Sequence, residues 1–148
     1  MAIEWREALS VGNDPIDADH KHLISLFNRT NALLSTKQPC NELIDVIAQL
    51  RKYTQDHFSR EEYIMIAAGH PKYDQHKRAH NELIEQLRLC TQPIFEMGNQ
   101  LPSSTEKLPK SIRDGLTGLL RFWLLEHVLK LDLQLKSLFV NRSKNYVP

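Results

Sequence analysis

Apolar residues recur along this chain at the three-to-four-residue spacing of amphipathic helices, in four separate stretches. The four stretches cover residues 17–35, 41–68, 71–94 and 111–138. Asp17 and Asn41 are residue types that cap helix N-termini, and Gly69 followed by Pro71 separates the second stretch from the third. Strand-like alternation is absent. The pattern therefore predicts an all-α protein.

Polar segments flank and divide the four predicted helices. Residues 1–16 are expected to form an irregular N-terminal arm with two apolar anchors, Ile3 and Trp5, and residues 140–148 a polar tail. The segment MGNQLPSSTEKLPK (residues 97–110) separates the last two helices. Short joints favour an up-down-up-down four-helix bundle. We thus expect one domain over residues 1–148, with the bundle over residues 17–139.

Composition narrows the class of protein without identifying it. The chain has 148 residues, 41% of them hydrophobic and 25% charged, and its formal net charge is +1. This balance gives no electrostatic reason to expect nucleic acid or an anionic membrane as a partner. The N-terminus lacks the pattern of a secretory signal, and no window of 18 residues is long and apolar enough to span a membrane. The two cysteines are isolated in the sequence and form no disulfide framework, which is typical of a reducing compartment. We therefore expect a cytoplasmic protein.

Histidines occupy unexpected places in the helical pattern. Five of the seven fall on the apolar stripes of the predicted helices, and so does the carboxylate of Glu61. The five are His20, His57, His76, His80 and His127. A buried imidazole or carboxylate without a partner costs several kcal/mol, on the order of the effective penalty for buried ions. A single core histidine usually finds a local partner, but one shared metal centre would satisfy all five together.

The other two histidines do not follow this pattern. His22 lies about 200° around the helix from His20, since each residue adds about 100°. His70 falls in the joint between the second and third helices. We therefore expect both side chains to lie at the surface.

Spacing supports two ligand pairs and leaves a third doubtful. HFSRE (residues 57–61) and HKRAH (residues 76–80) each place two candidate ligands four residues apart, on one helix face. EHVLKLD places His127 and Asp132 five residues apart, a rotation of about 140°. Asp132 would have to lean across, or the helix would need a local bulge. By spacing alone it is the weakest candidate.

Five imidazoles and two carboxylates exceed the needs of one metal ion, but two ions can share them if the carboxylates bridge. This ligand set suits iron, and also zinc, manganese or copper. Structural zinc sites usually have four ligands with cysteine among them, which does not fit. Ferritin-type di-iron sites are richer in carboxylate and use Glu-x-x-His motifs that are missing at these positions. The sequence predicts a histidine-rich centre for two metal ions.

The motifs IDADH, HFSREE, HPKYDQHKRAH and WLLEHVLKLD, in this order, resemble the signature of the hemerythrins, and of bacterial hemerythrins in particular. The segment WREALSVGNDPID also resembles the N-terminal arm of that family. The resemblance extends from about Ile3 to Leu138 and implies a four-helix bundle. It also implies that Asp132 is a ligand, which its spacing left doubtful.

The resemblance implies two iron ions with an oxo or hydroxo bridge. The implied ligands are His76, His80 and His127 on one iron, His20 and His57 on the other, and Glu61 and Asp132 bridging both. The second iron would keep an open position, where molecular oxygen would bind end-on. The bound oxygen would take two electrons from the iron pair and the proton of the bridging hydroxide, and its release would reverse these steps. The implied function is reversible oxygen binding for storage, delivery or sensing.

Four apolar residues close to these ligands would wall the oxygen pocket by the same resemblance: Phe58, Trp123, Leu124 and Val128. An apolar wall slows irreversible oxidation, because loss of peroxide needs a proton and water. The alternative is that Phe58 and Trp123 are only core aromatic residues.

Three departures from the family pattern leave the ligands in place. Asp19 stands where the family often has an amide, and is expected to alter the surroundings of His20. His70 stands where an aromatic residue is common. The segment 98–110 looks longer than the usual third joint, and is a candidate surface for a protein partner.

Two other functions remain open on this sequence. One is a di-iron redox enzyme that handles peroxide or nitric oxide or repairs iron centres. The other is an oxygen or redox sensor that acts through a partner protein.

Overall fold

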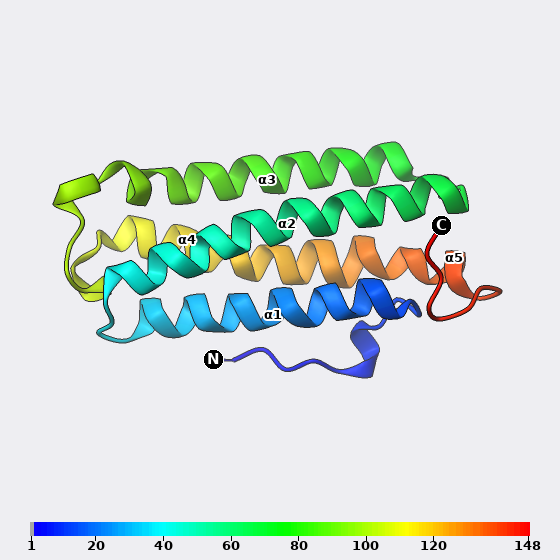
Figure 1. Cartoon of the computed structure of the whole chain (residues 1–148), viewed down its shortest axis with the longest axis horizontal. Helices are drawn as coiled ribbons and strands as arrows, with labels where there is room; N and C mark the ends of the chain where they lie inside the picture. The colour runs from blue at the N-terminus through cyan, green and yellow to red at the C-terminus, as the bar shows by residue number, and fades with distance from the viewer. Residues whose placement is uncertain (1) are drawn as a thin grey trace.

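A computed structural model describes residues 2–148 and shows a bundle of four long helices. The first three are α1 (Asp14–Ser35), α2 (Cys40–Ala68) and α3 (Tyr73–Glu96). The fourth is a run of consecutive helical segments that begins with α4 (Lys110–Phe122). Successive helices run in opposite directions and lie side by side (Figure 1). The predicted all-α, up-down-up-down architecture is confirmed.

The fourth helix changes its type along its length. After α4 come a π-helix, η4 (Trp123–Leu131), a 3-10 turn, η5 (Asp132–Leu135), and a last α-helical turn, α5 (Lys136–Phe139). Within residues 2–148, three further 3-10 turns lie outside the long helices: η1 (Glu7–Leu9), η2 (Gly98–Gln100) and η3 (Thr105–Lys107). The sequence left a local bulge here as one of two alternatives, and the π-helix is that bulge.

Helix α1 begins earlier than predicted, because Asn13 caps it and not Asp17. The Asn13 side chain accepts a hydrogen bond from the backbone N–H of Ile16 at 3.2 Å, and Pro15 occupies the first turn, where its fixed φ suits a helix. Asp17 instead accepts from the backbone N–H of Val11 at 2.9 Å and from the Ser10 hydroxyl at 2.5 Å. Its role is to hold the N-terminal arm against α1.

The polar segment between α3 and α4 is fastened to the turn between α1 and α2. Thr105 is buried there; its backbone N–H donates to the Gln38 carbonyl and its hydroxyl to the Thr36 carbonyl, both at 2.8 Å. The backbone N–H of Cys40 donates to the Ser103 carbonyl at 3.3 Å. Helix α2 therefore starts at Cys40 with help from this segment, and the prediction that Asn41 caps α2 was wrong. A partner surface on residues 98–110 stays a prediction.

Two apolar clusters fill the bundle, one toward each end. The larger lies where α1 ends and α2 begins, and the smaller lies where α2 ends and α5 follows. The larger includes Phe27, Leu43, Ile47, Leu50, Leu116 and Leu120; the smaller includes Val11, Ile16, Met65, Leu135 and Phe139. Along every helix, the predicted metal ligands fall between residues of these two clusters. The bundle thus contains a polar layer between two apolar ones.

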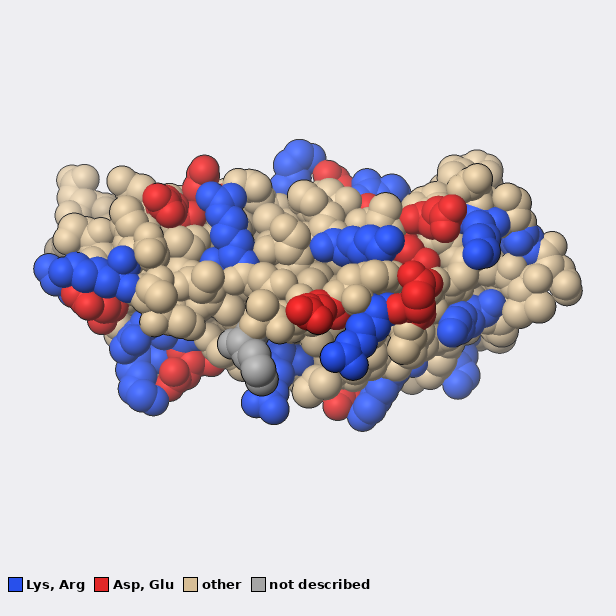
Figure 2. Space-filling model, turned by 90° about the horizontal axis from the view of Figure 1, so that it is seen from below, with Lys and Arg blue, Asp and Glu red and all other residues tan. Residues whose placement is uncertain are grey.

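Both chain ends pack on α1. Asn28 and the backbone of Ile3 exchange two hydrogen bonds of 2.7 Å, and the backbone N–H of Asp14 donates to the Lys144 carbonyl at 2.7 Å. On the face that bears the arm, Lys and Arg side chains alternate with Asp and Glu (Figure 2). Among the described residues, none of the helices combines the length and the apolar character that crossing a membrane requires.

Candidate metal centre

All seven residues predicted to bind metal meet in the polar layer, and each is at most 2% exposed. They come from every long helix: His20 on α1, His57 and Glu61 on α2, His76 and His80 on α3, and His127 and Asp132 on the fourth. So many buried histidine and carboxylate side chains at one level are costly unless their polar atoms find partners, and a bound metal ion would be a common partner.

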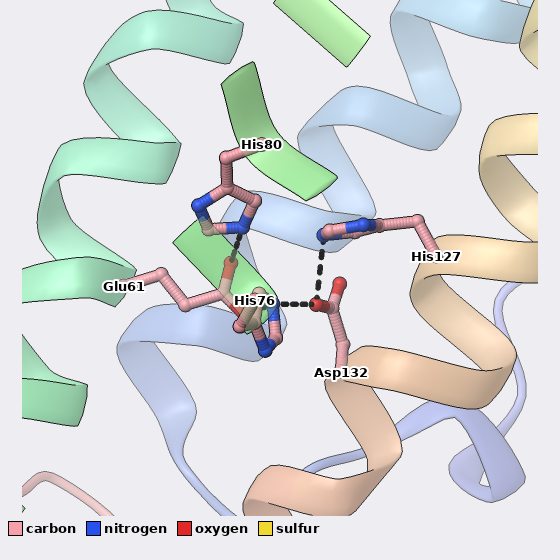
Figure 3. Close-up of side chains that lie close together, drawn as sticks. All are labelled: Glu61, His76, His80, His127 and Asp132. Carbon is pink, nitrogen blue, oxygen red and sulfur yellow. Dashed lines mark hydrogen bonds and ion pairs between the residues drawn. The ribbon is translucent and has the colours of Figure 1, made fainter. Parts of the chain in front are cut away.

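The seven residues form two overlapping groups that could each hold a metal ion. The groups are Glu61, His76, His80, His127 and Asp132, and His20, His57, Glu61 and Asp132; in each, the ligand atoms lie within 4.8 Å of one another. The first group is drawn in Figure 3, where side chains from α2, α3 and the fourth helix point toward one another. Glu61 and Asp132 belong to both groups, so each carboxylate could contribute an oxygen to either one.

Distances between the ligand atoms fit a shared cation. In the first group, the Asp132 Oδ1 atom lies 2.9 Å from His76 Nε2 and 3.0 Å from His127 Nε2. In the second, His57 Nε2 to Glu61 Oε2 and His20 Nε2 to Asp132 Oδ2 are both 3.0 Å. Two ligands at right angles on an ion, with bonds of about 2.1 Å, would lie about 3.0 Å apart.

Several of these atoms are close together without forming hydrogen bonds. The atoms that have no hydrogen-bond partner within residues 2–148 are His20 Nε2, His80 Nε2, His127 Nε2, both Glu61 carboxylate oxygens and Asp132 Oδ2. A buried polar atom without a partner costs about 1–3 kcal/mol. These atoms therefore lie close together without the geometry of hydrogen bonds, and metal ions bound by the two groups would give each of them a partner.

Glu61 and His57, which face each other in this layer, shift each other's pKa in opposite directions. Burial and the Asp132 carboxylate act against ionisation of Glu61, but the neighbouring His57 and His80 side chains outweigh them and lower the pKa of Glu61 to about 2. Burial also acts against a charged His57, but Glu61 and Asp19 raise its pKa to about 10. Metal-bound imidazole is neutral, so an incoming divalent ion would displace such protons.

The π-helix explains how Asp132 reaches the centre. In η4 the backbone N–H of Asp132 donates to the carbonyl of His127, five residues earlier, which is the hydrogen bond of a π turn. The wider turn brings a residue five positions on to the same helix face. Asp132 therefore lies beside His127 in the layer without leaning across the helix.

Two further carboxylates contact the outer nitrogens of the histidines. Asp19 Oδ2 accepts from His57 Nδ1 at 3.0 Å, and Glu62 Oε2 accepts from His80 Nδ1 at 2.7 Å. The prediction that Asp19 alters the surroundings of His20 was wrong, because neighbours on a helix point about 100° apart and Asp19 faces α2. Sequence reasoning missed Glu62, whose signal was the second glutamate of HFSREE.

The two histidines outside the set differ from each other. His22 is exposed, as predicted, with its ring 4.2 Å from that of Tyr53. His70 is buried, so the prediction of a surface position was wrong. After Gly69, with φ of 70°, the backbone N–H of His70 donates to the Met65 carbonyl at 2.9 Å, which closes the helix and places the ring 6.1 Å from that of His76.

Aromatic side chains pack directly against the histidines. The Phe58 ring stacks on His80, with ring centroids 3.8 Å apart, and lies 5.6 Å from His57 and 5.5 Å from His127. Trp123 packs 5.6 Å from Phe58 and is fully buried. Val128 is buried beside them and Leu124 half-buried. These side chains give the polar layer an apolar wall.

Comparison with known proteins agrees with this arrangement. The family model described as the hemerythrin HHE cation binding domain matches residues 11–139. A bacteriohemerythrin of Clostridium acetobutylicum is 25% identical over 131 residues, which cover 86% of this chain and 94% of that protein. A bacteriohemerythrin of Stenotrophomonas maltophilia is 30% identical over 127 residues, covering 84% and 72%. A myohemerythrin of Theromyzon tessulatum is 29% identical over 93 residues, covering 63% and 72%. This chain belongs to the hemerythrin family.

Proposed function

We propose that this chain holds two iron ions in the polar layer and binds molecular oxygen reversibly at one of them. The observation that supports this is the pair of overlapping ligand groups that share Glu61 and Asp132. Imidazole with carboxylate is a ligand set that suits iron. When bound, the two ions supply the two electrons that reversible oxygen binding requires.

The two groups differ in the number of protein ligands, and this difference supports a proposal for the oxygen site. Three histidines and the two carboxylates would surround one ion. The other would have only His20, His57 and the same two carboxylates. The second ion would therefore keep a position for a small external ligand. This division is the basis for placing oxygen on the side of α1 and α2.

The protein's own contribution is to exclude water and to hold the ligands in place. Phe58, Trp123, Leu124 and Val128 would wall the oxygen pocket, where they keep out the water and protons that favour irreversible oxidation. Asp19 and Glu62 fix the ring orientation of two imidazoles through their outer nitrogens.

The direct test is anaerobic reconstitution with ferrous iron, followed by air. Protein loaded with two irons per chain should develop an oxygen-dependent charge-transfer absorption that disappears on deoxygenation. The matched pair of variants is His20→Ala and His22→Ala on the same helix. The first should lose the absorption, and the second, an exposed side chain, should keep it. No reversible absorption in fully loaded protein would contradict the proposal.

One observation favours a redox enzyme as the second candidate function. A crevice of about 440 Å³ between α3 and the fourth helix is lined by His127 together with Leu83, Phe122 and Leu131. A small reductant or peroxide in this crevice would approach a ligand of the centre from outside. Steady consumption of peroxide or nitric oxide by the loaded protein, without the reversible absorption, would favour this function over oxygen binding.

A further inference from the structure

The side chain of Asp19, the residue before His20, reaches from its own helix to the neighbouring one. Asp19 lies on α1 next to His20, yet its side chain crosses to α2 and is only 5% exposed. There it accepts from His57 Nδ1 at 3.0 Å, from the Tyr53 hydroxyl at 2.7 Å, and from Arg60 Nε and a terminal nitrogen at 2.9 and 2.7 Å. One carboxylate thus joins two helices.

The geometry points to Asp19, clamped by Tyr53 and Arg60, as the positioning residue of the metal position that has only two histidines. By accepting from His57 Nδ1, Asp19 fixes the ring and directs Nε2 toward Glu61, 3.0 Å away. This inference rests on the proposed metal centre, but not on oxygen binding.

The clamp makes a buried carboxylate stable in this place. Arg60 forms two parallel hydrogen bonds with it, the strong fork arrangement of a guanidinium and a carboxylate. The Arg60 side chain is about half exposed, so the cation remains partly hydrated, and it packs 5.5 Å from the Tyr53 ring. The imidazole of His57, the guanidinium of Arg60 and the hydroxyl of Tyr53 thus give both oxygens of this buried carboxylate hydrogen-bond partners.

The two metal positions depend on such outer contacts to different degrees. In the three-histidine group, Glu62 orients His80 and has Lys77 as its own partner. In the two-histidine group, the outer nitrogen of His20 has no hydrogen-bond partner among the described residues, so Asp19 orients the one imidazole that has such support. Loss of Asp19 should therefore weaken this position selectively.

The charge of Asp19 adds an electronic effect to the orientation. A carboxylate that accepts from the outer N–H of an imidazole makes that imidazole a stronger donor to its metal. A stronger donor stabilises the ferric state, so Asp19 should lower the reduction potential of the iron it serves. Asn at this position would keep an acceptor for His57 but remove the charge.

The test uses the full-length chain and cobalt(II), whose visible absorption reports its coordination, in titrations against a competing chelator. The parent should bind two ions. Asp19→Ala should bind one with parental affinity and the other about 10- to 100-fold more weakly. Two ions with parental affinity and spectrum in Asp19→Ala would overturn the inference. Asp19→Asn should weaken binding less than Asp19→Ala. It should also raise the potential of one iron in the iron-loaded protein; an unchanged potential would refute the electronic effect.

Two controls separate positioning from folding. Asp17 lies on the same helix, and its buried carboxylate contacts the N-terminal arm and no histidine. Asp17→Asn should therefore lower the free energy of unfolding without changing the ratio of the affinities for the two metal ions. If Asp19→Ala does not fold, Arg60→Gln and Tyr53→Phe leave Asp19 and His57 present; each should weaken the same ion by a smaller factor. Parental affinity in both would overturn the role of the clamp.

The failure of this inference is distinct from failure of the proposed function. A parent that binds two ions but shows no reversible oxygen absorption would contradict oxygen binding and leave the role of Asp19 standing. If the parent binds oxygen reversibly and Asp19→Ala equals it in metal affinity and reduction potential, the role of Asp19 is contradicted and oxygen binding remains supported.

Discussion

Helix α2 buries one continuous stripe, yet the two halves of that stripe carry opposite chemistry. The first half buries Leu43, Ile47 and Leu50, all 0% exposed, and the second buries His57 and Glu61 just as completely. Spacing and burial are the same in both. What differs is the source of stability. The apolar half gains about 25 cal/mol for each Å² removed from water, whereas the polar half gains nothing until its groups find partners.

The comparison shows that burial alone does not reveal what holds a layer together. Around Leu50 the neighbours are apolar side chains, which pack against one another without a bound ion. Around Glu61, both carboxylate oxygens lack hydrogen-bond partners within residues 2–148. The apolar half of the bundle should therefore be stable in itself, and the polar half should depend on bound metal.

Removal of the metal should have the largest effect on stability, and it should destabilise the polar half of the bundle. A ligand that binds only the folded state adds its binding free energy to stability, so chelation should lower the free energy of unfolding by several kcal/mol. Hydrogen exchange should show loss of protection around residues 57–61 and 76–80 before residues 43–50. Equal loss in both halves would break the comparison.

A cavity in the apolar half should cost nearly as much but leave the centre intact. Leu50→Ala should lower the free energy of unfolding by about 2–5 kcal/mol, the usual range for a buried leucine. The metal content of the folded protein should not change. Leu89→Ala, at a side chain that is 50% exposed, is the control and should cost far less. Denaturant unfolding and metal analysis of the same samples measure both quantities.

Converting the polar layer to an apolar one should stabilise the metal-free chain. Replacement of all seven candidate ligands by apolar residues of similar volume should raise the free energy of unfolding by about 1–4 kcal/mol, as replacement of buried ion pairs often does. The same protein should bind no metal. If the redesigned chain is less stable than the metal-free parent, the polar layer has a favourable energy of its own, and the contrast between the halves is weaker than we infer.

The smallest effect is expected at His70, which adjoins the layer without belonging to it. Neither ring nitrogen has a hydrogen-bond partner in the part of the chain that the structure describes, so His70→Phe should raise stability by about 1 kcal/mol. Burial, then the His76 and Lys72 charges, lower the pKa of His70. The unfolded chain therefore binds the proton more readily, and the cost of His70 grows as pH falls below about 6.5. Unfolding curves at pH 5.5 and 8 should show a larger gain at the lower pH.

The positions of candidate ligands could be predicted from the sequence where helical periodicity alone decides which side chains share a face. A 3.6-residue repeat places His57 and Glu61, or His76 and His80, on one face whatever the neighbours are, so these pairs could be predicted. Asp132 could not be placed by spacing, because its position depends on a π turn that no residue type announces. The family resemblance identified it as a candidate where helical geometry did not.

Contacts between helices explain the other errors. Asp19 was expected to act on His20, its neighbour in sequence, but its partners His57 and Arg60 come from the next helix. His70 was placed at the surface because it lies in a joint, while the hydrogen bond that turns it inward depends on the end of α2. The sequence also gives no sign that Thr105, in the segment 98–110, donates to the Thr36 carbonyl in the turn between α1 and α2. Such partners are set by packing, and local patterns do not contain them.

The π segment also has a consequence for the length of this chain. A turn closed by a bond to the fifth residue holds one residue more than an α turn, so η4 absorbs an extra residue while both flanking segments keep their faces. Within this stretch Leu131 is half-buried, and Leu135, in the next turn, is completely buried. Deleting one residue from 128–131 should convert the turn to α and bring His127 and Asp132 to a four-residue spacing, as in HFSRE. We therefore expect the fourth helix to tolerate the loss of one residue while His127 and Asp132 both remain in the polar layer.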